Sequence, residues 1–571
     1  MYIDRVPNRG SRPTLLLREG TRVGKKVKKT TLLNLTHWPS SCVEALERSL
    51  KGETLVGIDD VFVIERSLPH GHVEAIVEMA RKLEFESLIS STPCRERDLV
   101  MGMIVQRLIE PSSKLAVTRH WEGTTLANIF QVEETRVEDL YDAMNWLLRR
   151  QKRIEKKLAR RHLSDGTLVL YDVTSSSYHG RTCPLADFGY NRDGIKGLKS
   201  IVYGVLTDSE GRPISVQGYK GNTGDPATVI DQVDKLRRDY RLSRVILVGD
   251  RGMLTNARIE EMKAHPELGW ISALRTERIR DLIKSGAVDR SLFDERNLAE
   301  IRSDAFPGER LMVCLNPLLA DERSRKRDEL LAETEKALEK IRAQVRRRTR
   351  KRLTEGEIGL KVGRAIERHK MRKHFELTIE DGLFEWKRNE ASIRAEKALD
   401  GIYIIRTSEP EERLSAEETV RNYKNLARVE NAFRTLKGID VRVRPIHHRL
   451  EDRVRAHLFL CMLAYYLEWH LRKAWASLLF EDEEIEAERK TRHPVDAAKP
   501  SESARKKRTT KVNADGFPLH NLRTLLGELA TRCHNICRLK QQPGSPTATR
   551  LTEPSPLQTE ALRLIQMFPG T

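Results

Sequence analysis

The sequence predicts an α/β protein with a mixed β-sheet, and two observations support this prediction. Three apolar runs rich in β-branched residues, separated by turn residues, predict successive strands at 167–172, 200–206 and 213–219. Helical and apolar segments then alternate, which is typical of strands joined by crossover helices. The order of elements between residues 164 and 275 is therefore β-β-β-α-β-α-β.

The alternating part begins with Asp225 and Pro226, a capping residue followed by proline at the first helical position. A buried strand, a helix and a final strand follow at 245–250, 256–264 and 270–274. This order resembles the ribonuclease-H-like core, a mixed five-stranded sheet with helices in which a parallel fourth strand joins three antiparallel ones. Strands one and four are then neighbours about 4.8 Å apart. We expect Asp172 and Asp250, at their C-terminal ends, to lie side by side.

Length and charge limit the functions to consider. The chain has 571 residues, enough for about three or four structural units, and its 102 Lys and Arg exceed its 83 Asp and Glu by 19. This excess favours a polyanionic partner, first nucleic acid and second an anionic membrane surface. The most apolar stretch, 458–471, contains Glu468 and His470 and is shorter than the roughly 20 residues of a membrane span. No secretory signal pattern is present, so we expect the protein to stay in a reducing cytosol.

The cysteines and phosphate-loop motifs argue against other kinds of site. Seven cysteines at irregular spacing do not form a disulfide framework. Cys533 and Cys537 enclose His534 but lack a second ligand pair, so we expect an ordinary helix there and no zinc. The chain also contains no Walker phosphate loop, so we expect no ATP site.

Two regions precede the core. Residues 1–75 are predicted as an N-terminal β-rich region, with β-prone runs at 14–17 and 55–64. Residues 76–163 are predicted as a helical DNA-binding region, because apolar residues recur at three- and four-residue intervals. The basic residues at 149–157 suit phosphate contact, and they suit a solvated helix face equally well.

The pattern of the core is interrupted after residue 275, and we predict an insertion domain at 276–414. It contains a charged helix at 323–352, followed by β-prone pieces. The densest basic run of the chain ends this helix and includes Arg346, Arg347 and Arg348. Such a run is usually a hydrated surface, but in so basic a chain we expect it to bind phosphate.

The second part of the core is predicted at 415–480. A capping box at Ser415 opens a helix that runs to Lys437. At 100° per residue, Glu430 and Arg434 lie beside the apolar stripe of this helix. Glu430 can therefore face a catalytic groove, or it can be a surface glutamate in an i,i+4 ion pair with Arg434.

The end of the chain is less informative. Residues 481–515 pass from acidic to basic and contain prolines, so we predict a flexible linker. Residues 516–571 are predicted as a C-terminal helical tail. An amphipathic helix near 522–537 suits docking or a dimer contact.

Asp172, Asp250 and Glu430 together suggest a metal site. Two divalent ions about 3.5–4 Å apart, held by carboxylates, activate an attacking water or hydroxyl and neutralise the leaving oxygen of a phosphodiester. Mg²⁺ prefers such oxygen ligands, so we expect two Mg²⁺ ions per site, with Mn²⁺ as a substitute. Each aspartate also has a plain structural interpretation, in which Asp172 ends a strand and Asp250 caps the next helix.

Four motifs resemble those of bacterial insertion-sequence DDE transposases. In chain order they are Tyr171-Asp172-Val-Thr174, Gly221-Asn222-Thr-Gly-Asp225, Val248-Gly-Asp250-Arg251-Gly252-Met253 and the stretch from Tyr423 to Lys437. The resemblance is to the IS4 group, most closely to its IS1634-like branch, and covers roughly residues 165 to 470. Arg442-Val-Arg444-Pro445-Ile-His447 also resembles that branch.

The resemblance implies roles for five residues. Asp172, Asp250 and Glu430 become the catalytic metal ligands. Tyr423 and Lys437 match the outer members of a signature that handles DNA phosphates around the third acid. An insertion domain between the second and third acids is also implied.

One position departs from the family pattern. The residue four before Glu430, which is arginine in the wider group, is Leu426 here. We expect Arg428 or Arg434 to supply the missing phosphate contact, or the processing of DNA ends to differ in detail.

The predicted function is that of an insertion-sequence transposase. It hydrolyses phosphodiesters at the element ends and then directs the freed 3′-hydroxyl into target DNA. We expect double-stranded DNA as the partner, both terminal inverted repeats and target, with a homodimer on DNA and a bacterial cytoplasmic, nucleoid-associated location. Two alternatives remain open: a metal-dependent nuclease without strand transfer, and a catalytically inactive DNA-binding derivative.

Overall fold

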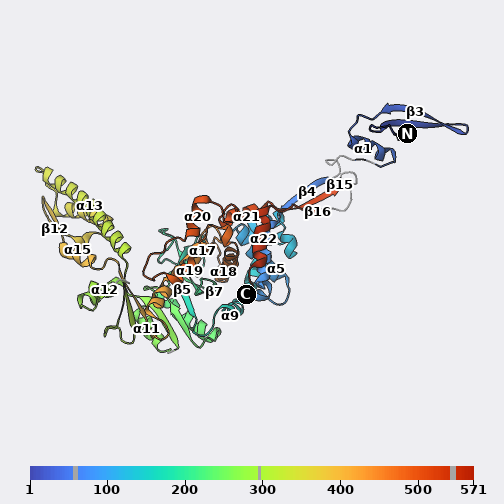
Figure 1. Ribbon diagram of the computed structural model, residues 1–571. Coiled ribbons are helices and arrows are strands. Elements are labelled where there is room, and N and C mark those ends of the chain that lie inside the picture. The colour runs from blue at the N-terminus through green and yellow to red at the C-terminus, as the bar shows by residue number, and fades with distance from the viewer. Residues whose placement is uncertain (54, 56–61, 266, 294–296, 540–547, 571) are drawn as a thin grey trace. The chain divides into compact units, whose positions relative to one another are not determined.

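The computed structural model describes residues 1–53, 55, 62–265, 267–293, 297–539 and 548–570 (Figure 1). The chain forms two compact units, which are described separately below. The smaller unit combines Met1–Pro69 with Arg532–Glu553, and the larger combines His70–Thr531 with Pro554–Thr571. Segments far apart in the sequence therefore complete each unit.

Two antiparallel three-stranded sheets and one helix make up the described part of the smaller unit. The strand orders are β1-β2-β3 and β16-β15-β4. The bounds are β1 Tyr2–Val6, β2 Thr14–Val23, β3 Lys26–Asn34, α1 Ser40–Leu50, β4 Phe62–Pro69, β15 Cys533–Leu539 and β16 Ala548–Leu551. The run predicted at 14–17 lies in β2, whereas most of the run predicted at 55–64 lies outside the described residues.

The helix predicted around Cys533 and Cys537 is wrong. Helix α21 (Leu522–Ala530) ends earlier, and both cysteines lie in β15, which pairs with β4 on one side and β16 on the other. Across β15 and β4, Ser67 donates a hydrogen bond to Asn535 at 2.8 Å over 468 positions of sequence. Local periodicity carries no signal of so distant a partner, and tertiary pairing decides the conformation.

An eight-stranded mixed sheet forms the centre of the larger unit, in the order β10-β11-β14-β9-β8-β5-β6-β7. Its strands are β5 Leu168–Ser177, β6 Ser200–Asp208, β7 Pro213–Lys220, β8 Val245–Val248, β9 Leu268–Ala273, β10 Leu298–Ile301, β11 Arg310–Leu315 and β14 Ile402–Thr407. β5, β6 and β7 are antiparallel neighbours, whereas β8 runs parallel to both β5 and β9. The arrangement of the five strands from β5 to β9 agrees with the order predicted from the sequence.

The sheet is larger than the five strands predicted. β10, β11 and β14 come from the segment expected to be an insertion domain, and they extend the sheet beyond β9. β5 is also longer than predicted, because β6 pairs with it as far as Ser177. Asp172 therefore lies within its strand and not at the end, although the pairing of β5 with β8 stops at Leu170.

Three helices from the second part of the core pack on the sheet, namely α16 Ala416–Lys424, α17 Leu426–Lys437 and α18 Glu451–Ala474. α16 contacts β9, β11 and β14, α17 contacts β5 and β6, and α18 contacts β7. The single helix predicted to run to Lys437 is thus divided at Asn425, while its capping box at Ser415 is confirmed.

Helix α18 is buried along most of its length, which explains the most apolar stretch of the sequence. It packs against α3, α5 and α8 as well as the sheet. Among the helices of the described ranges, none has the length and apolarity needed to cross a membrane.

The helical region predicted at 76–163 begins the larger unit. Its helices are α3 Gly71–Lys82, α4 Phe85–Ile89, α5 Arg95–Ile109, α6 Lys114–His120, α7 Leu126–Phe130, α8 Val137–Leu148 and α9 Gln151–His162. α5 is the central one, since it packs against α7, α8 and α18 and is buried over most of its residues.

Segment 276–414 is not a single inserted body, because its β10, β11 and β14 belong to the main sheet. Its other elements are α12 Thr276–Lys284, α13 Pro317–Arg347, α14 Glu355–Arg368, β12 Phe375–Glu380, β13 Leu383–Arg388 and α15 Glu390–Lys397. α13, α14 and the β12–β13 hairpin share a hydrophobic cluster of their own, which includes Leu338, Val362 and Phe384. We call this group the α13 subdomain.

The structure also corrects the prediction of a flexible linker at 481–515, because this segment contains helices α19 Ile485–Thr491 and α20 Glu502–Thr510. The buried ammonium of Lys507 donates to the carbonyl oxygens of Ala476, Leu479 and Glu481. A polar composition does not reveal such an anchor. Three further helices of the described residues are α10 Asp225–Asp234, α11 Asn256–Lys263 and α22 Pro556–Met567.

Candidate active site

Asp172 and Asp250 occupy matching positions on neighbouring parallel strands. The register pairs Leu170 of β5 with Val248 of β8, and each aspartate follows two residues later. Neighbouring strands lie about 4.8 Å apart. The two carboxylates are therefore at the same edge of the paired strands.

A tight turn holds Asp250. Its Oδ1 accepts hydrogen bonds from the backbone amides of Gly252 at 2.9 Å and Met253 at 2.8 Å. The structural interpretation of Asp250 as a turn residue thus holds for Oδ1. Since both amides bind that one oxygen, Oδ2 is left for another partner.

Asp172 is half-buried, and its Oδ1 accepts a hydrogen bond from the backbone amide of Val173 at 2.7 Å. Burial raises the pKa of Asp172 to about 7, the negative charge of Asp250 adds to the rise, and the Val173 hydrogen bond opposes it. The charge of Arg192 also lowers the pKa of Asp172, but this guanidinium is already paired with Asp225. The carboxylate is therefore held near a like charge with little compensation, a situation that a bound cation relieves.

Glu430 lies on α17, which packs against β5. The buried residues Val429 and Phe433 fix this helix, and the Phe433 ring meets that of Tyr203 edge-on with centroids 6.0 Å apart. Glu430 itself is exposed. The ion pair with Arg434 that the alternative interpretation required is absent from the interactions of the described residues.

Tyr423 connects the three acids electrostatically. Burial, with smaller contributions from the charges of Asp250, Glu430 and Asp172, raises the pKa of its phenol to about 12, while Arg251 opposes them. One side chain thus lies within the electrostatic reach of all three carboxylates, which come from β5, the turn after β8 and α17.

The donor set fits a divalent cation, because three carboxylates without histidine or cysteine are the oxygen ligands that Mg²⁺ prefers. Within the described ranges, no three His, Cys, Asp or Glu side chains are already close enough to hold one ion. The register of β5 and β8 brings the two aspartates to one edge of the sheet, and Glu430 lies on the helix that packs against β5.

The comparisons with known proteins bear on this site. The family model described as "Transposase DDE domain" matches residues 163–467, which is more than half of the chain. The chain belongs to this family. It is therefore a transposase, an enzyme that cleaves DNA and transfers strands, and its family generally uses divalent metal ions.

Other comparisons add little to this assignment. No curated protein matches the sequence. A solved structure similar to the transposase is described as "Cryo-EM structure of piggyBac transposase synaptic complex with hairpin DNA". That match covers 69% of this chain and 71% of the other at 11% identity, with a TM-score of 0.33.

Lys437, predicted to handle DNA phosphates, is engaged within the transposase. Its ammonium donates to the carboxylate of Asp193 at 3.0 Å and to the carbonyl oxygen of Ser175. Arg444 reaches the same Asp193 oxygen at 2.6 Å, and the amide and hydroxyl of Ser177 bind the other. We call Asp193, Lys437 and Arg444 the Asp193 cluster.

The Asp193 cluster ties α17 and the chain after it to β5. Burial opposes ionisation of Asp193, but the Ser177 hydrogen bonds and the charges of Lys437 and Arg444 outweigh burial and hold its pKa below the ordinary value. Sequence reasoning missed Asp193, because its charged partners Lys437 and Arg444 lie more than 200 positions away. Its only local signal is a place before Gly194 in a loop.

The two arginines expected to replace the missing family contact differ. Arg428 is paired with the carboxylate of Glu486 at 2.7 and 2.6 Å and donates to the carbonyl oxygen of Ser209. Arg434 is exposed, and its side chain has no ion pair among the described residues. Arg434 is thus the more accessible of the two to an incoming phosphate.

The basic run of Arg346, Arg347 and Arg348 lies at the end of α13. Arg346 pairs with Glu385 of β13 at 2.7 Å. In the described part of the chain, the side chains of Arg347 and Arg348 form no ion pair. This run belongs to the α13 subdomain, so it is not among the residues that the β5–β8 edge brings together.

Proposed function

We propose that the chain is an insertion-sequence transposase of the IS4 group, most like the IS1634 branch, with a ribonuclease-H-like core formed by β5 to β9. The order of these strands, with β8 parallel to β5, supports this core. The motifs at Asp172, Asp250 and Glu430 support the group.

We propose further that Asp172, Asp250 and Glu430 hold two Mg²⁺ ions, or Mn²⁺ in their place. The observation that carries this proposal is the matching register of Asp172 and Asp250, together with the common influence of all three acids on Tyr423. When bound, such ions lower the pKa of an attacking water or hydroxyl and neutralise the leaving oxygen.

The side chains around the acids position the DNA in this proposal. Arg434, exposed one helical turn after Glu430, meets the phosphate that the wider group binds with an arginine before the acid. Tyr423 and Lys437 flank the same phosphate. Arg428 can bind this phosphate as well if it releases the carboxylate of Glu486. Arg346, Arg347 and Arg348 bind backbone phosphates elsewhere on the DNA.

The proposed reaction has two steps at one site. Water first attacks the phosphodiester at an element end and releases a 3′-hydroxyl, which then attacks a phosphodiester of target DNA. Each step exchanges one phosphorus–oxygen bond for another, so one carboxylate set serves both. Double-stranded DNA, a homodimer on DNA and a cytoplasmic, nucleoid-associated location complete the proposal.

Labelled element ends and a supercoiled plasmid test this proposal. In Mg²⁺, the wild-type enzyme should cut the ends and join them to the plasmid, and Asp172→Asn, Asp250→Asn and Glu430→Gln should each lose more than about a hundredfold, since even outer-shell partners of a metal site contribute 10–100-fold. The control is Glu277→Gln, an exposed glutamate on α12. Cleavage without joined product would favour the nuclease, and unchanged activity in all three variants would refute the site.

A further inference from the structure

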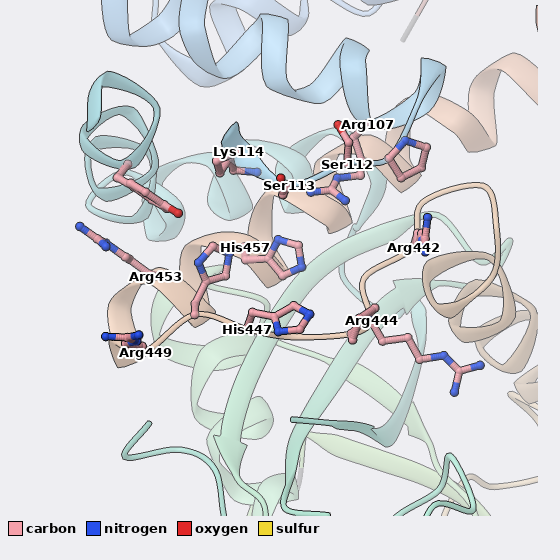
Figure 2. Close-up of a pocket in the computed structure, with 14 residues that line it drawn as sticks. Arg107, Ser112, Ser113, Lys114, Arg442, Arg444, His447, Arg449, Arg453 and His457 are labelled. Carbon is pink, nitrogen blue, oxygen red and sulfur yellow. The ribbon is translucent and has the colours of Figure 1, made fainter. Parts of the chain in front are cut away.

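A cavity of about 550 Å³ lies between the N-terminal helices and the chain that precedes α18. Its walls carry six cationic side chains, from Arg107, Lys114, Arg442, Arg444, Arg449 and Arg453, and three histidines. Among the described residues that line it there is no aspartate or glutamate. Figure 2 shows Arg107, Ser113 and Lys114 along one wall and the segment with Arg444 and His447 along the facing wall.

Two of these cations are buried. Arg107 on α5 is 6% exposed and Lys114 on α6 is 5% exposed. Neither has an acidic partner among the described residues. A buried charge costs several kcal/mol unless it is paired, so two such cations lining one cavity favour a compensating anion, which none of the described residues supplies.

The neighbouring groups are consistent with an anion. The hydroxyl of Ser112 is buried without a hydrogen-bond partner in the described structure and can donate to an oxyanion. Burial lowers the pKa of Lys114 to about 7, with the charge of Arg107 contributing, so a bound oxyanion would favour the ammonium form that burial disfavours. Burial also lowers the pKa of His448, to about 3, and that of His457, so these histidines are neutral donors or acceptors and not competing charges.

The cavity is connected to the strand that carries Asp172. Ile446 forms a parallel bridge with Tyr178, just beyond the end of β5, and its carbonyl oxygen accepts a hydrogen bond from the amide of His179 at 2.9 Å. Tyr178 is six residues after Asp172, which is about 20 Å along an extended strand. At about 3.4 Å per base pair, this span corresponds to roughly six base pairs of duplex DNA.

We propose that this cavity binds phosphate groups of a DNA strand whose scissile phosphate lies at the carboxylate edge. This inference rests on the proposed function and adds to it an anchoring site for the DNA backbone. The exposed side chains of Arg442, His447 and Arg449 form the rim, so a backbone can reach the buried pair from solvent. A free polyphosphate offers the same oxyanions, and the experiment distinguishes the two sources.

The test measures binding of a labelled duplex by fluorescence anisotropy in EDTA, where no cleavage occurs. The double variant R107M/K114M should bind at least tenfold more weakly than wild type, since two charge-assisted phosphate contacts are lost. Its plot of log affinity against log salt should be flatter by about one to two, because each phosphate contact contributes about 0.9 to the slope. Arg449→Gln, an exposed change that leaves the packing intact, should flatten the slope by about one.

The matched control is K473M/K490M, which removes two exposed lysines from α18 and α19 and should bind within about twofold of wild type. Pyrophosphate at matched ionic strength should displace DNA from the wild type but not from R107M/K114M. Pyrophosphate binding that leaves DNA affinity unchanged would overturn the assignment to DNA in favour of a free polyphosphate.

The inference and the proposed function fail separately. If Arg449→Gln and R107M/K114M bind DNA as the control does, while the wild type still cleaves and Asp172→Asn does not, the cavity is not a DNA anchor and the active site stands. If Asp172→Asn cleaves normally, the proposed active site fails whatever the cavity does.

Discussion

Replacing Lys114 by methionine should stabilise the DNA-free enzyme, although it removes a residue proposed to bind DNA. Burial lowers the pKa of this ammonium from 10.5 to about 7. At roughly 1.4 kcal/mol per pKa unit, the charged form is disfavoured by about 5 kcal/mol in the fold. Methionine keeps the length of the side chain and carries no charge, so it relieves this cost.

The gain should depend on pH in a defined direction. Unfolded lysine holds its proton up to about pH 10.5, whereas folded Lys114 releases it near pH 7, so between these values the unfolded state binds more protons and wild-type stability rises with pH. The advantage of Lys114→Met should therefore fall from about 5 kcal/mol at pH 6 to about 2 kcal/mol at pH 9. The facing histidines do not interfere, because burial lowers the pKa of His448 to about 3 and that of His457 well below its ordinary value, so both stay neutral over this range.

Thermal unfolding at pH 6 and pH 9 measures this difference. Lys114→Met should unfold at a higher temperature than wild type at both values, with the larger gap at pH 6, while Lys473→Met on the exposed side of α18 should show no gap. A Lys114→Met variant that is less stable than wild type, or whose advantage grows with pH, would show that the cavity holds no uncompensated cation at Lys114.

Three further predictions concern the carboxylates and the arginines beside them. Burial and Asp250 raise the pKa of Asp172 from 3.8 to about 7, so between these pH values the folded state binds more protons than the unfolded state. The stability of the metal-free enzyme therefore falls as the pH rises from about 4 to 7. In thermal unfolding in EDTA, Asp172→Asn should be more stable than wild type at pH 8, by up to about 4 kcal/mol, and should show no advantage near pH 4. Asp193→Asn leaves Lys437 and Arg444 without their carboxylate and should lower the free energy of unfolding by on the order of 3 kcal/mol. The control Asp452→Asn, at an exposed position, should leave this free energy unchanged. Equal free energies of unfolding for the two variants would contradict the role of the Asp193 cluster. Glu486→Gln releases Arg428 and should tighten DNA binding a few-fold in anisotropy, an effect that must disappear in the Arg428→Gln background if Arg428 contacts phosphate.

Much of the central sheet could be predicted because its signals are local. The runs that form β5, β6 and β7 are apolar and separated by turn residues, and the apolar run of β8 is short and bounded. The expectation that Asp172 and Asp250 lie side by side comes from the resemblance to the ribonuclease-H-like order, in which the first and fourth strands are neighbours, and the parallel pairing of β5 with β8 agrees with it. The position of Asp172 inside β5 did not follow, because it depends on how far β6 continues beside it.

The features that could not be predicted depend on distant partners. β15 is a strand because β4 and β16 pair with it, not because of its own composition. The Asp193 cluster joins a loop after β5 to α17 and to Arg444, which are separated from it by more than 200 residues. The cationic cavity likewise combines Lys114 from α6 with the segment around His447, and neither stretch alone indicates a pocket.

The most direct test of the central claim is a structure of the enzyme bound to an element end and Mn²⁺, with the ions located by anomalous scattering. We expect ions within about 2.0–2.2 Å of carboxylate oxygens from Asp172, Asp250 and Glu430, next to the scissile phosphate. Ions held by other residues, or a Glu430 that remains away from them while the DNA is in place, would contradict it.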